Sequence, residues 1–476
     1  MMASTAASYR EITDANGRIY RVGETDRELL GMSRAWMVWL PWLAMMSISV
    51  FEYGYGAAED TIRDKHGWSL GQTFWIVTIW AVFQAGVAFP AGRLREKNIV
   101  SARTAMLLGA LFTCIGFVSI AAFSELPLVW IGYSVVGGTG AGLVYATCIN
   151  MVSKWYPEKK GARTGFVNGG FAYGAVPFIY VFTYWFHPSN FELVMCLVGL
   201  YMLVVVGACA LFFKDPPKNW WPADVDPREW QKAVTSAKAQ SLAKNPPAVR
   251  QLSPMQALRT GQLELMWIAF CIVGAVSLFG SAYQVPFAKD AGFGPFIAAS
   301  SAGVLSVVNG VGRAAVGWVS DYMGRKQTLV LVLVIEGLAQ FGLLWSGKAG
   351  LEIPFLIMAF VAGFGGGAFF PLFAAITPDY FGENDNASNY GLVYSAKLPS
   401  AIVGIGIGSS LIDAIGYTWT YTIGGLLSIV AAIVITFLRQ PGRHHPAPVA
   451  AKPMANRARA KPVTSGDAAV APNWAD

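Results

Sequence analysis

The chain has 476 residues, of which 54% are hydrophobic and 13% are charged, and its mean hydropathy is +0.46. Soluble globular proteins carry about 25% charged residues, so this composition excludes an ordinary soluble domain and indicates a chain solvated mostly by lipid. The net charge of +7 does not require a nucleic-acid partner, because the topology derived below accounts for it.

The first part of the chain is a polar tail followed by six apolar stretches. Residues 1–34 mix charges of both signs and contain no short apolar segment with a cleavage site, so we expect a water-exposed tail and no removable signal peptide. A hydrocarbon layer of ~30 Å takes about 20 helical residues to cross. Stretches of that length fall at 36–56, 71–91, 103–123, 127–153, 164–186 and 191–213.

A polar linker and six further apolar stretches follow. Residues 214–262 carry two Pro-Pro pairs and scattered charges, which is typical of a water-exposed segment that buries no core of its own. The later stretches fall at 263–283, 296–319, 328–345, 353–376, 389–411 and 417–438, before a second polar tail at 439–476. We therefore predict an all-α membrane protein with twelve transmembrane helices, in two six-helix bundles at residues 35–213 and 263–438.

The basic residues predict the orientation of these helices. Two of the 35 Lys and Arg residues lie inside predicted helices, and four lie in loops on one side: Arg63, Lys65, Lys289 and Lys348. All the others fall in the tails, the linker and the loops on the opposite side. The positive-inside rule places that side, and both termini, in the cytoplasm. We expect a multi-pass protein of the cell (inner, cytoplasmic) membrane.

Three features recur at one offset of 225 residues. This offset relates the loops that begin at Gly92 and Gly317, the glycine clusters at 138–142 and 363–367, and the pairs Trp155-Tyr156 and Tyr380-Phe381. Two halves with the same topology are the parallel repeats of the major facilitator fold, in which the substrate site lies near the midplane between the halves.

Two cations stand alone in apolar stretches, Arg313 in 296–319 and Lys397 in 389–411. A charge at mid-bilayer depth costs at least ~2.5 kcal/mol, and such residues usually face a cavity on a substrate or ion path. Each lies eight residues from the predicted cytoplasmic end of its helix, which is ~12 Å of depth. The functional hypothesis is an anion site, with Arg313 as a planar fork for one carboxylate and Lys397 as a second point charge. The alternative is that each cation snorkels or pairs with a structural acid.

Residues 317–326 read Gly-Trp-Val-Ser-Asp-Tyr-Met-Gly-Arg-Lys and resemble the conserved loop motif of the major facilitator superfamily. Gly317, Asp321, Gly324 and Arg325 match that motif, whereas the first-half copy lacks the Asp-x-x-Gly-Arg core. Glycines permit close helix contact, and an acid at a helix end can meet donors across the half. The resemblance implies a conformational latch and carries no information about the substrate.

The segments around the two cations resemble helices 8 and 11 of the oxalate/formate antiporter family. They read Asn-Gly-Val-Gly-Arg up to Arg313, and Tyr-Gly-Leu-Val-Tyr-Ser-Ala-Lys up to Lys397. In that family the matching Arg and Lys bind the substrate carboxylates between aromatic side chains. The resemblance covers residues 36–438.

Aromatic and amide side chains complete the predicted site. Tyr394 precedes Lys397 by three residues and therefore shares its helix face. Rings at similar depth could close around a flat anion or could be ordinary packing residues, and amides could bind the anion or could join helices. These residues are Tyr145, Tyr173 and Phe370 for the rings, and Gln84 and Asn309 for the amides.

Two acids also lie in apolar stretches. Glu52 could carry a proton or pair with a cation, although its place near the outer end of 36–56 favours an interfacial acid near water. Glu336 falls in a helix that is peripheral in the resembling family, so we expect it to be protonated or structural rather than part of the path.

The predicted function is secondary transport of small carboxylates by alternating access. Oxalate/formate-type exchange is the first form, because two cations match two carboxylates and an empty site would hold charges that repel each other. The alternatives are a proton-coupled symporter for a monocarboxylate such as pyruvate or lactate and, from another class, a transporter-like receptor or sensor. We expect no enzyme activity, metal site or cofactor, and the partners are the carboxylate anion and membrane lipid. The sequence does not determine the oligomeric state, and a monomer is one of the alternatives.

Overall fold

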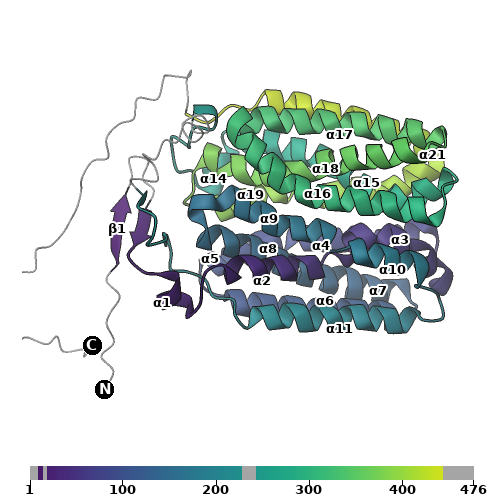
Figure 1. Ribbon diagram of the computed structural model, residues 1–476, viewed down its shortest axis with the longest axis horizontal. Helices are drawn as coiled ribbons and strands as arrows, with labels where there is room; N and C mark the ends of the chain where they lie inside the picture. The colour runs from purple at the N-terminus through teal and green to yellow at the C-terminus, as the bar shows by residue number, and fades with distance from the viewer. Residues whose placement is uncertain (1–8, 14–18, 228–242, 443–476) are drawn as a thin grey trace, which may run out of the picture.

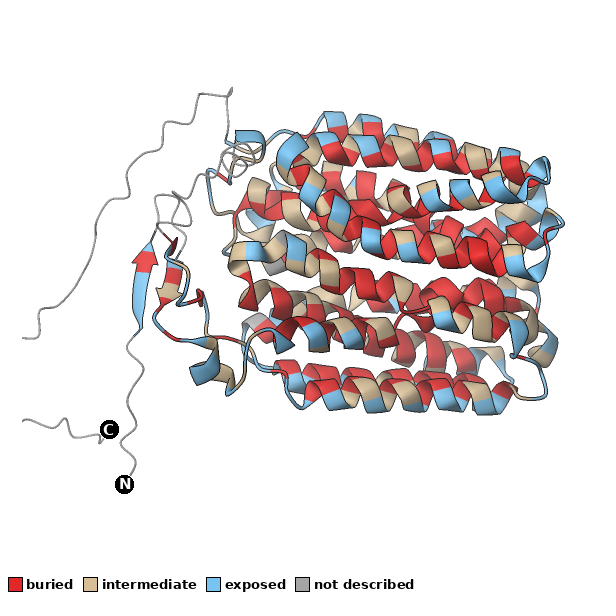
Figure 2. Cartoon of the chain, in the orientation of Figure 1, coloured by how far each residue is buried: buried red, intermediate tan, exposed pale blue. Residues whose placement is uncertain are grey.

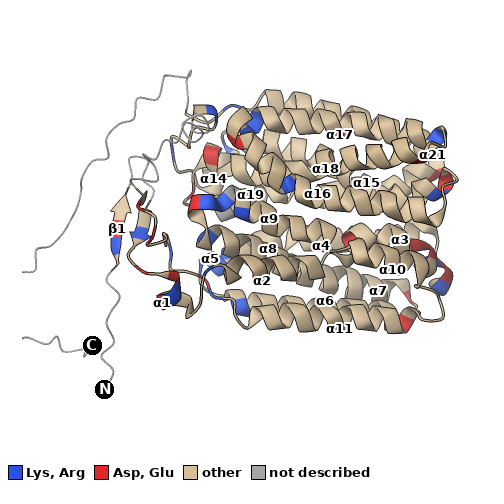
Figure 3. Cartoon of the chain, viewed as in Figure 1, with Lys and Arg blue, Asp and Glu red and all other residues tan. Residues whose placement is uncertain are grey.

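The computed structural model describes residues 9–13, 19–227 and 243–442. Its helices run side by side along one direction, and the two halves of the chain form two adjoining layers (Figure 1). A small hairpin of strands lies beyond one end of the bundle, which we call the linker end, and we call the opposite end the far end. Charged residues concentrate at these two ends (Figure 3), as expected of a bundle whose middle faces hydrocarbon.

The first half contains six spans. The first is broken into two helices at Ile48 and Ser49, and several others change helix type or break once. The elements are α2 Trp36–Ser47, α3 Val50–His66, α4 Leu70–Gly86, α5 Ala88–Glu96, α6 Ala102–Ala122, α7 Leu126–Val129, η1 Trp130–Gly137, α8 Gly138–Trp155, η2 Pro157–Lys159, α9 Lys160–Tyr173, α10 Val176–Tyr184 and α11 Phe191–Ala210.

The second half also contains six spans. The largely helical stretch Ser388–Thr436 has 49 residues, or about 74 Å at 1.5 Å per residue, which is too long for one crossing. Gly416, at φ 72° and ψ 170°, divides it into two. The elements are α15 Gln262–Asp290, α16 Pro295–Met323, α17 Arg325–Lys348, α18 Glu352–Phe381, α19 Asn386–Tyr394, α20 Lys397–Ala401, η3 Ile402–Ile407 and α21 Gly408–Thr436. Ten helical stretches of the described residues are long and apolar enough to cross a membrane. Division of Ser388–Thr436 at Gly416 and addition of the broken α2–α3 pair give the twelve spans that the apolar stretches predict.

The internal repeat is visible in the packing of two glycines. A Cβ on Gly142 of α8 would lie 2.2 Å from the carbonyl oxygen of Gln84, and one on Gly367 of α18 would lie 2.3 Å from that of Asn309. Both the glycines and their contacts are 225 residues apart. The two halves therefore use the same close helix crossing, which only a residue without a side chain permits.

A helix break directly precedes Lys397. Pro399 has no N–H to donate to the carbonyl of Ser395, and the N–H of Leu398 bonds that carbonyl instead, at 3.0 Å. The chain is therefore divided between α19 and α20 at residues 395–396. Irregular backbone inside a membrane is tolerated where protein surrounds it, as it does here, since Ala396 and Lys397 are buried.

The prediction that the N-terminal tail and the linker bury no core is wrong for their described parts. Strands β1 Arg10–Thr13 and β2 Ile19–Val22 pair antiparallel, and Ile12, Tyr20 and Val22 pack on Trp221 of the linker. Helix α1 Asp26–Leu30 follows β2, and helix α14 Pro254–Leu258 lies at the second end of the linker. Residues 443–476, most of the predicted C-terminal tail, lie outside the described residues.

The interface between the halves is closed at both ends by ion pairs. At the far end Lys289 of α15 bonds Asp60 of α3. At the linker end the Lys160 ammonium lies 2.7 Å from the Glu383 carboxylate. Buried residues fill the space between these ends, where the two layers meet (Figure 2). The fold therefore holds the residues of the predicted site away from water.

Candidate functional site

Arg313 of α16 lies in the interface between the halves, with 1% of its surface exposed. Its Nε and Nη2 donate to Oδ1 of Asn309 at 3.2 and 2.7 Å. From the first half, Oδ1 of Asn168 accepts from Nη1 at 2.6 Å and the Tyr53 hydroxyl accepts from Nη2 at 2.9 Å. Among the described residues every hydrogen-bond partner of this guanidinium is neutral. Its charge is therefore solvated by the protein but not balanced.

Lys397 of α20 meets the first half in a different way. Its Nζ lies 2.8 and 2.9 Å from the two carboxylate oxygens of Glu52 and donates to Oε1 of Gln84 at 2.9 Å. The side chains of Lys397 and Glu52 are 1% and 2% exposed. The expectation of two unneutralised cations is therefore wrong for Lys397, whereas Arg313 has no ion-pair partner among the described residues.

The structure also corrects the placement of Glu52. The sequence favours an acid near water at the outer end of a span that finishes at residue 56, but α3 continues to His66. Glu52 lies in the first turn of α3, which is near the middle of the broken span formed by α2 and α3, and it is buried. The residues after Gly56 include Glu59, Asp60 and Arg63, and their polarity makes the apolar stretch shorter than the helix. With two cations and one carboxylate, the site has one net positive charge.

Aromatic rings surround the two cations. Tyr145 and Tyr394 stack across the interface, with ring centroids 5.3 Å apart and planes at 17°. The Arg313 guanidinium lies 4.8 Å from the ring centroid of Phe370, and the Lys397 ammonium lies 5.9 Å from that of Tyr394. These three predicted rings therefore line the site. Phe370 and Tyr394 lie within the range of cation–π attraction to Arg313 and Lys397.

The other predicted residues divide into those at the site and one beside it. Asn309 and Gln84 each bond one of the cations. Tyr173 is only half-buried, and its hydroxyl accepts from the indole of Trp42 on the same half rather than facing a cation. Its ring packs on Gly310, one turn from Arg313. Tyr173 therefore packs on the helix that carries Arg313.

Three residues at the site escaped the sequence interpretation. Tyr53 and Asn168 bond Arg313, and the ring of Phe171 lies 5.6 Å from the Lys397 ammonium. The Tyr145 hydroxyl also donates to Oδ1 of Asn168, at 3.1 Å. An amide in the middle of an apolar stretch was a usable signal for Asn168, because such side chains join helices in membranes.

The loop motif forms a polar cluster at the linker end. Arg325 bonds Asp379 of α18, and its Nη2 lies 3.6 Å from Oδ1 of Asp321. Gly324 has φ 98°, so it supplies the turn between α16 and α17. Gly317 does not supply a close contact, since a Cβ there would meet no atom within 4 Å.

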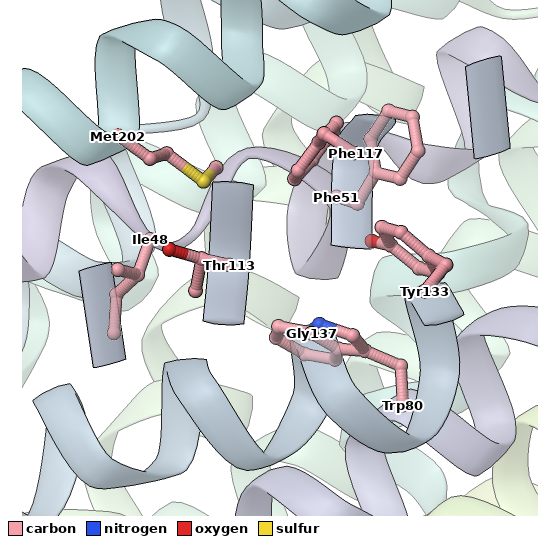
Figure 4. Close-up of a pocket in the computed structure, with 8 residues that line it drawn as sticks. All are labelled: Ile48, Phe51, Trp80, Thr113, Phe117, Tyr133, Gly137 and Met202. Atoms are coloured by element: carbon pink, nitrogen blue, oxygen red, sulfur yellow. The ribbon is translucent and has the colours of Figure 1, made fainter. Parts of the chain in front are cut away.

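A small cavity of about 10 Å³, roughly the space of one water molecule, lies inside the first half, apart from these residues (Figure 4). Thr113 and Gly137 line it together with apolar and aromatic side chains, and none of the residues predicted for the site is among them. Its remaining lining residues are Ile48, Phe51, Trp80, Phe117, Tyr133 and Met202. The cavity offers no charge to an anion.

Comparisons with known proteins agree with this architecture. The family model described as Major Facilitator Superfamily matches residues 41–350 and 265–472. The oxalate:formate antiporter of Oxalobacter formigenes is 25% identical over 396 residues, covering 83% of this chain and 89% of the relative. Monocarboxylate transporter 12 of Mus musculus is 22% identical over 383 residues, covering 77% of each. The crystal structure of a D-xylose-proton symporter, 14% identical, superposes with a TM-score of 0.63 over 84% of this chain and 96% of that one, which shows the fold alone.

Proposed function

This chain belongs to the Major Facilitator Superfamily, and we propose that it transports small carboxylates across the membrane by alternating access. One observation carries the proposal: Arg313 is buried between the halves, and its described hydrogen-bond partners are all neutral. A buried guanidinium whose charge is not balanced attracts an anion. Its planar fork matches the two oxygens of a carboxylate.

The proposed binding step exchanges hydrogen bonds at Arg313. A carboxylate that takes the place of the Asn309 and Tyr53 oxygens would keep the donors satisfied and would add the missing negative charge. The stacked rings of Tyr145 and Tyr394 exclude water, which strengthens this attraction. Both cations of the second half form hydrogen bonds to residues of the first half. A bound anion would therefore change the contact between the two halves.

The first form of this function is exchange of the oxalate/formate type. Its support is the pair of cations on α16 and α20 and the similarity to the oxalate:formate antiporter. A dicarboxylate bound to both cations would have to displace Glu52 from Lys397. This form therefore requires Glu52 to turn away or to take up a proton.

A second form, proton-coupled transport of a monocarboxylate, is favoured by the Lys397–Glu52 pair. The pair leaves one net positive charge at the site, which one monocarboxylate balances. It also removes the repulsion expected in an empty site, so the empty carrier can reorient without an anion. The similarity to monocarboxylate transporter 12 agrees with this form. No observation on the described residues favours the receptor alternative.

We also propose the topology that the basic residues predict, with the linker end in the cytoplasm and the carrier in the cell membrane. Helix ends on that side carry Arg95, Lys154 and Arg325, and helix ends on the far side carry Arg63 and Lys289. Under this assignment the Lys160–Glu383 pair closes the cytoplasmic end of the interface.

Purified protein in proteoliposomes tests the proposal. Uptake of labelled oxalate, formate, pyruvate and lactate is measured with and without internal anion, and with and without a pH gradient. We expect carboxylate uptake that Arg313→Gln abolishes and that Lys348→Gln, an exposed far-end control, leaves intact. Uptake that depends on internal anion supports exchange, and uptake driven by an inward proton gradient supports symport. Absence of uptake for all four anions, or full uptake by Arg313→Gln, refutes the proposal.

A further inference from the structure

Glu336 of α17 is an acid buried inside the second half, away from the two cations. It is 1% exposed, and its Oε1 accepts from Nε2 of Gln340 at 2.9 Å. Its second oxygen, Oε2, has no hydrogen-bond partner among the described residues. An acid inside a membrane bundle is a candidate functional residue because its burial is costly.

The helices packed against α17 face Glu336 with neutral groups. Helix α15 contributes Ser277, whose hydroxyl donates to the carbonyl of Gly366 at 2.8 Å. Helix α21 contributes Tyr421, the titratable group that interacts electrostatically with Glu336. No Lys, Arg, Asp or Glu of α15, α16, α18 or α21 forms an ion pair or hydrogen bond with Glu336 in the described structure. The carboxyl group therefore has no cation to balance a negative charge.

Further polar atoms in these helices lack partners among the described residues. They are Oε1 of Gln340, both amide ends of Gln284 and the hydroxyl of Tyr421, all on residues at most 1% exposed. Gln284 lies two turns beyond Ser277 on α15, and Gln340 lies one turn beyond Glu336 on α17. Unsatisfied buried polar atoms are rare in proteins, so each of these atoms needs an explanation such as strain, a functional role or a small bound partner.

Glycines of α18 make room for this acid. A Cβ on Gly366 would lie 3.3 Å from each carboxylate oxygen of Glu336, and one on Gly365 would lie 2.7 Å from the Glu336 nitrogen. The glycine cluster thus admits the backbone and the carboxyl group of Glu336 at once.

We propose that Glu336 is a proton-binding site, separate from the anion site and linked to it through α18. An isolated buried carboxylate costs several kcal/mol, and the group avoids that cost by holding a proton. The proton adds to Oε2 from water and is released to water, so no other reactant is needed. In the protonated state the acid O–H is a donor, and Oε1 of Gln340 becomes its acceptor once that amide rotates.

Helix α18 connects Glu336 to Arg313. One residue after Gly366, a Cβ on Gly367 would lie 2.7 Å from Cγ of Asn309, the side chain that accepts from Arg313. One turn further, the Phe370 ring lies under the guanidinium. A shift of α18 that accommodates charge on Glu336 therefore moves the Phe370 ring and changes the packing of Gly367 against Asn309 of α16. By linkage, a bound anion changes proton affinity as much as the proton changes anion affinity.

Glu52 is a different kind of acid. It is paired with Lys397 in the anion site, so its negative charge is already balanced. If proton transport accompanies the anion, the unpaired acid is the one that the structure prepares to hold the proton. This inference rests on the proposed carboxylate function for its coupling part only.

Infrared difference spectroscopy of the purified protein tests the proton site without any substrate. We expect the carbonyl band of a protonated carboxylic acid at neutral pH, lost on alkalisation, and absent from Glu336→Gln. The control Glu352→Gln, at the exposed start of α18, keeps the band. A band that persists in Glu336→Gln, or no such band in the wild type, overturns the proposal. Thermal stabilisation of the wild type by Na⁺ at alkaline pH that Glu336→Gln loses overturns it in favour of a cation site.

Anion affinity measured between acidic and alkaline pH tests the link. We expect a change of about 5-fold or more in the wild type and in Glu352→Gln, and less than about 2-fold in Glu336→Gln. Equal pH dependence in all three proteins overturns the link between the sites. A Glu336 infrared band in a protein that transports no carboxylate would refute the proposed function while leaving the proton site in place.

Discussion

The Lys397 ammonium contacts both carboxylate oxygens of Glu52, at 2.8 and 2.9 Å, across the interface between the two halves. The residues are 345 positions apart in the chain, and both are buried. In the proposed exchange of a dicarboxylate, the second carboxylate of the substrate would have to take the place that Glu52 occupies beside Lys397. In the empty carrier, the charge of Lys397 is therefore already balanced by a carboxylate of the protein.

Removal of either partner of this pair should destabilise the protein strongly. Glu52→Gln leaves a buried ammonium without its counter-charge, which costs about 3–5 kcal/mol in comparable buried pairs. The double variant Glu52→Gln/Lys397→Met removes both charges and should recover most of the loss. Thermal unfolding in detergent measures this, with Glu352→Gln as the exposed control. Equal loss in the single and double variants would show that the pair does not act as a unit.

Arg313→Lys should weaken anion binding at least about 10-fold, or about 1.4 kcal/mol. Lysine keeps the charge but lacks the fork that reaches Asn309, Asn168 and Tyr53 together. Competition binding with a small carboxylate measures the effect, and Arg439→Lys is the exposed control. Unchanged affinity would mean that only the charge at this position matters.

The two ion pairs at the ends of the interface should bias the carrier in opposite directions. Lys289→Gln breaks the bond to Asp60 and should populate a state open at the far end. Lys160→Gln breaks the bond to Glu383 and should open the linker end. Partly exposed pairs contribute about 0.2–1 kcal/mol, so the populations should shift by up to about 5-fold.

Spin-label distances check this prediction in a background without the five native cysteines. Labels at 187 and 348 report on the far end, and labels at 162 and 384 report on the linker end. Each substitution should lengthen only the distance at its own end. Lengthening at both ends would indicate general loosening instead of alternation.

Asp215 of the linker should stabilise the first half except at acidic pH. Burial alone would raise the pKa of Asp215, but the nearby Arg95 and Lys154 charges hold that pKa below its usual range. Because the folded state lowers the pKa, the stabilisation is complete above the unfolded value of 3.8 and is lost as the pH falls through the folded value. Asp215→Asn should cost about 1–3 kcal/mol at pH 7, since it removes the charged partner of buried Arg95.

Unfolding measured from pH 8 to pH 3 checks this. The difference between wild type and Asp215→Asn should be constant down to about pH 5 and should shrink below about pH 4. Asp224→Asn, at a highly exposed acid of the same linker, should change stability little at any pH. A difference that grows on acidification would contradict the assignment.

Gly367→Ala should destabilise the second half by about 1–3 kcal/mol, because its Cβ would overlap the backbone of Asn309. Gly317→Ala places the same methyl group in open space on α16 and should be neutral or stabilising by up to about 1 kcal/mol. Thermal unfolding of the two variants compares them directly. A neutral Gly367→Ala would show that α18 can move away from α16 at no cost.

Much of the fold could be predicted because lipid imposes local rules. Every backbone group inside a membrane must bond within its own helix, so each span appears as an apolar stretch of readable length. Arg313 was readable for the same reason, since a lone cation inside such a stretch is conspicuous. The end of the first span could not be predicted, because polar residues continue the helix to His66. The position of Glu52 within the span was therefore predicted wrongly.

The docking of the linker and the hairpin was also hidden from the sequence. Trp221 and Tyr20 are far apart in the chain, and each alone is an aromatic residue in a polar segment. Asn168 bonds Arg313 only because α9 and α16 pack against each other in the folded protein.

The sequence by itself determined the repeat, most of the spans and the placement of Arg313 and Lys397 inside spans, because each follows from neighbouring residues and the thickness of the bilayer. Only the tertiary structure decided which of the two cations has a carboxylate partner. Lys397 meets Glu52 and Arg313 meets amides and a hydroxyl, and this choice depends on how two separately encoded bundles pack against each other.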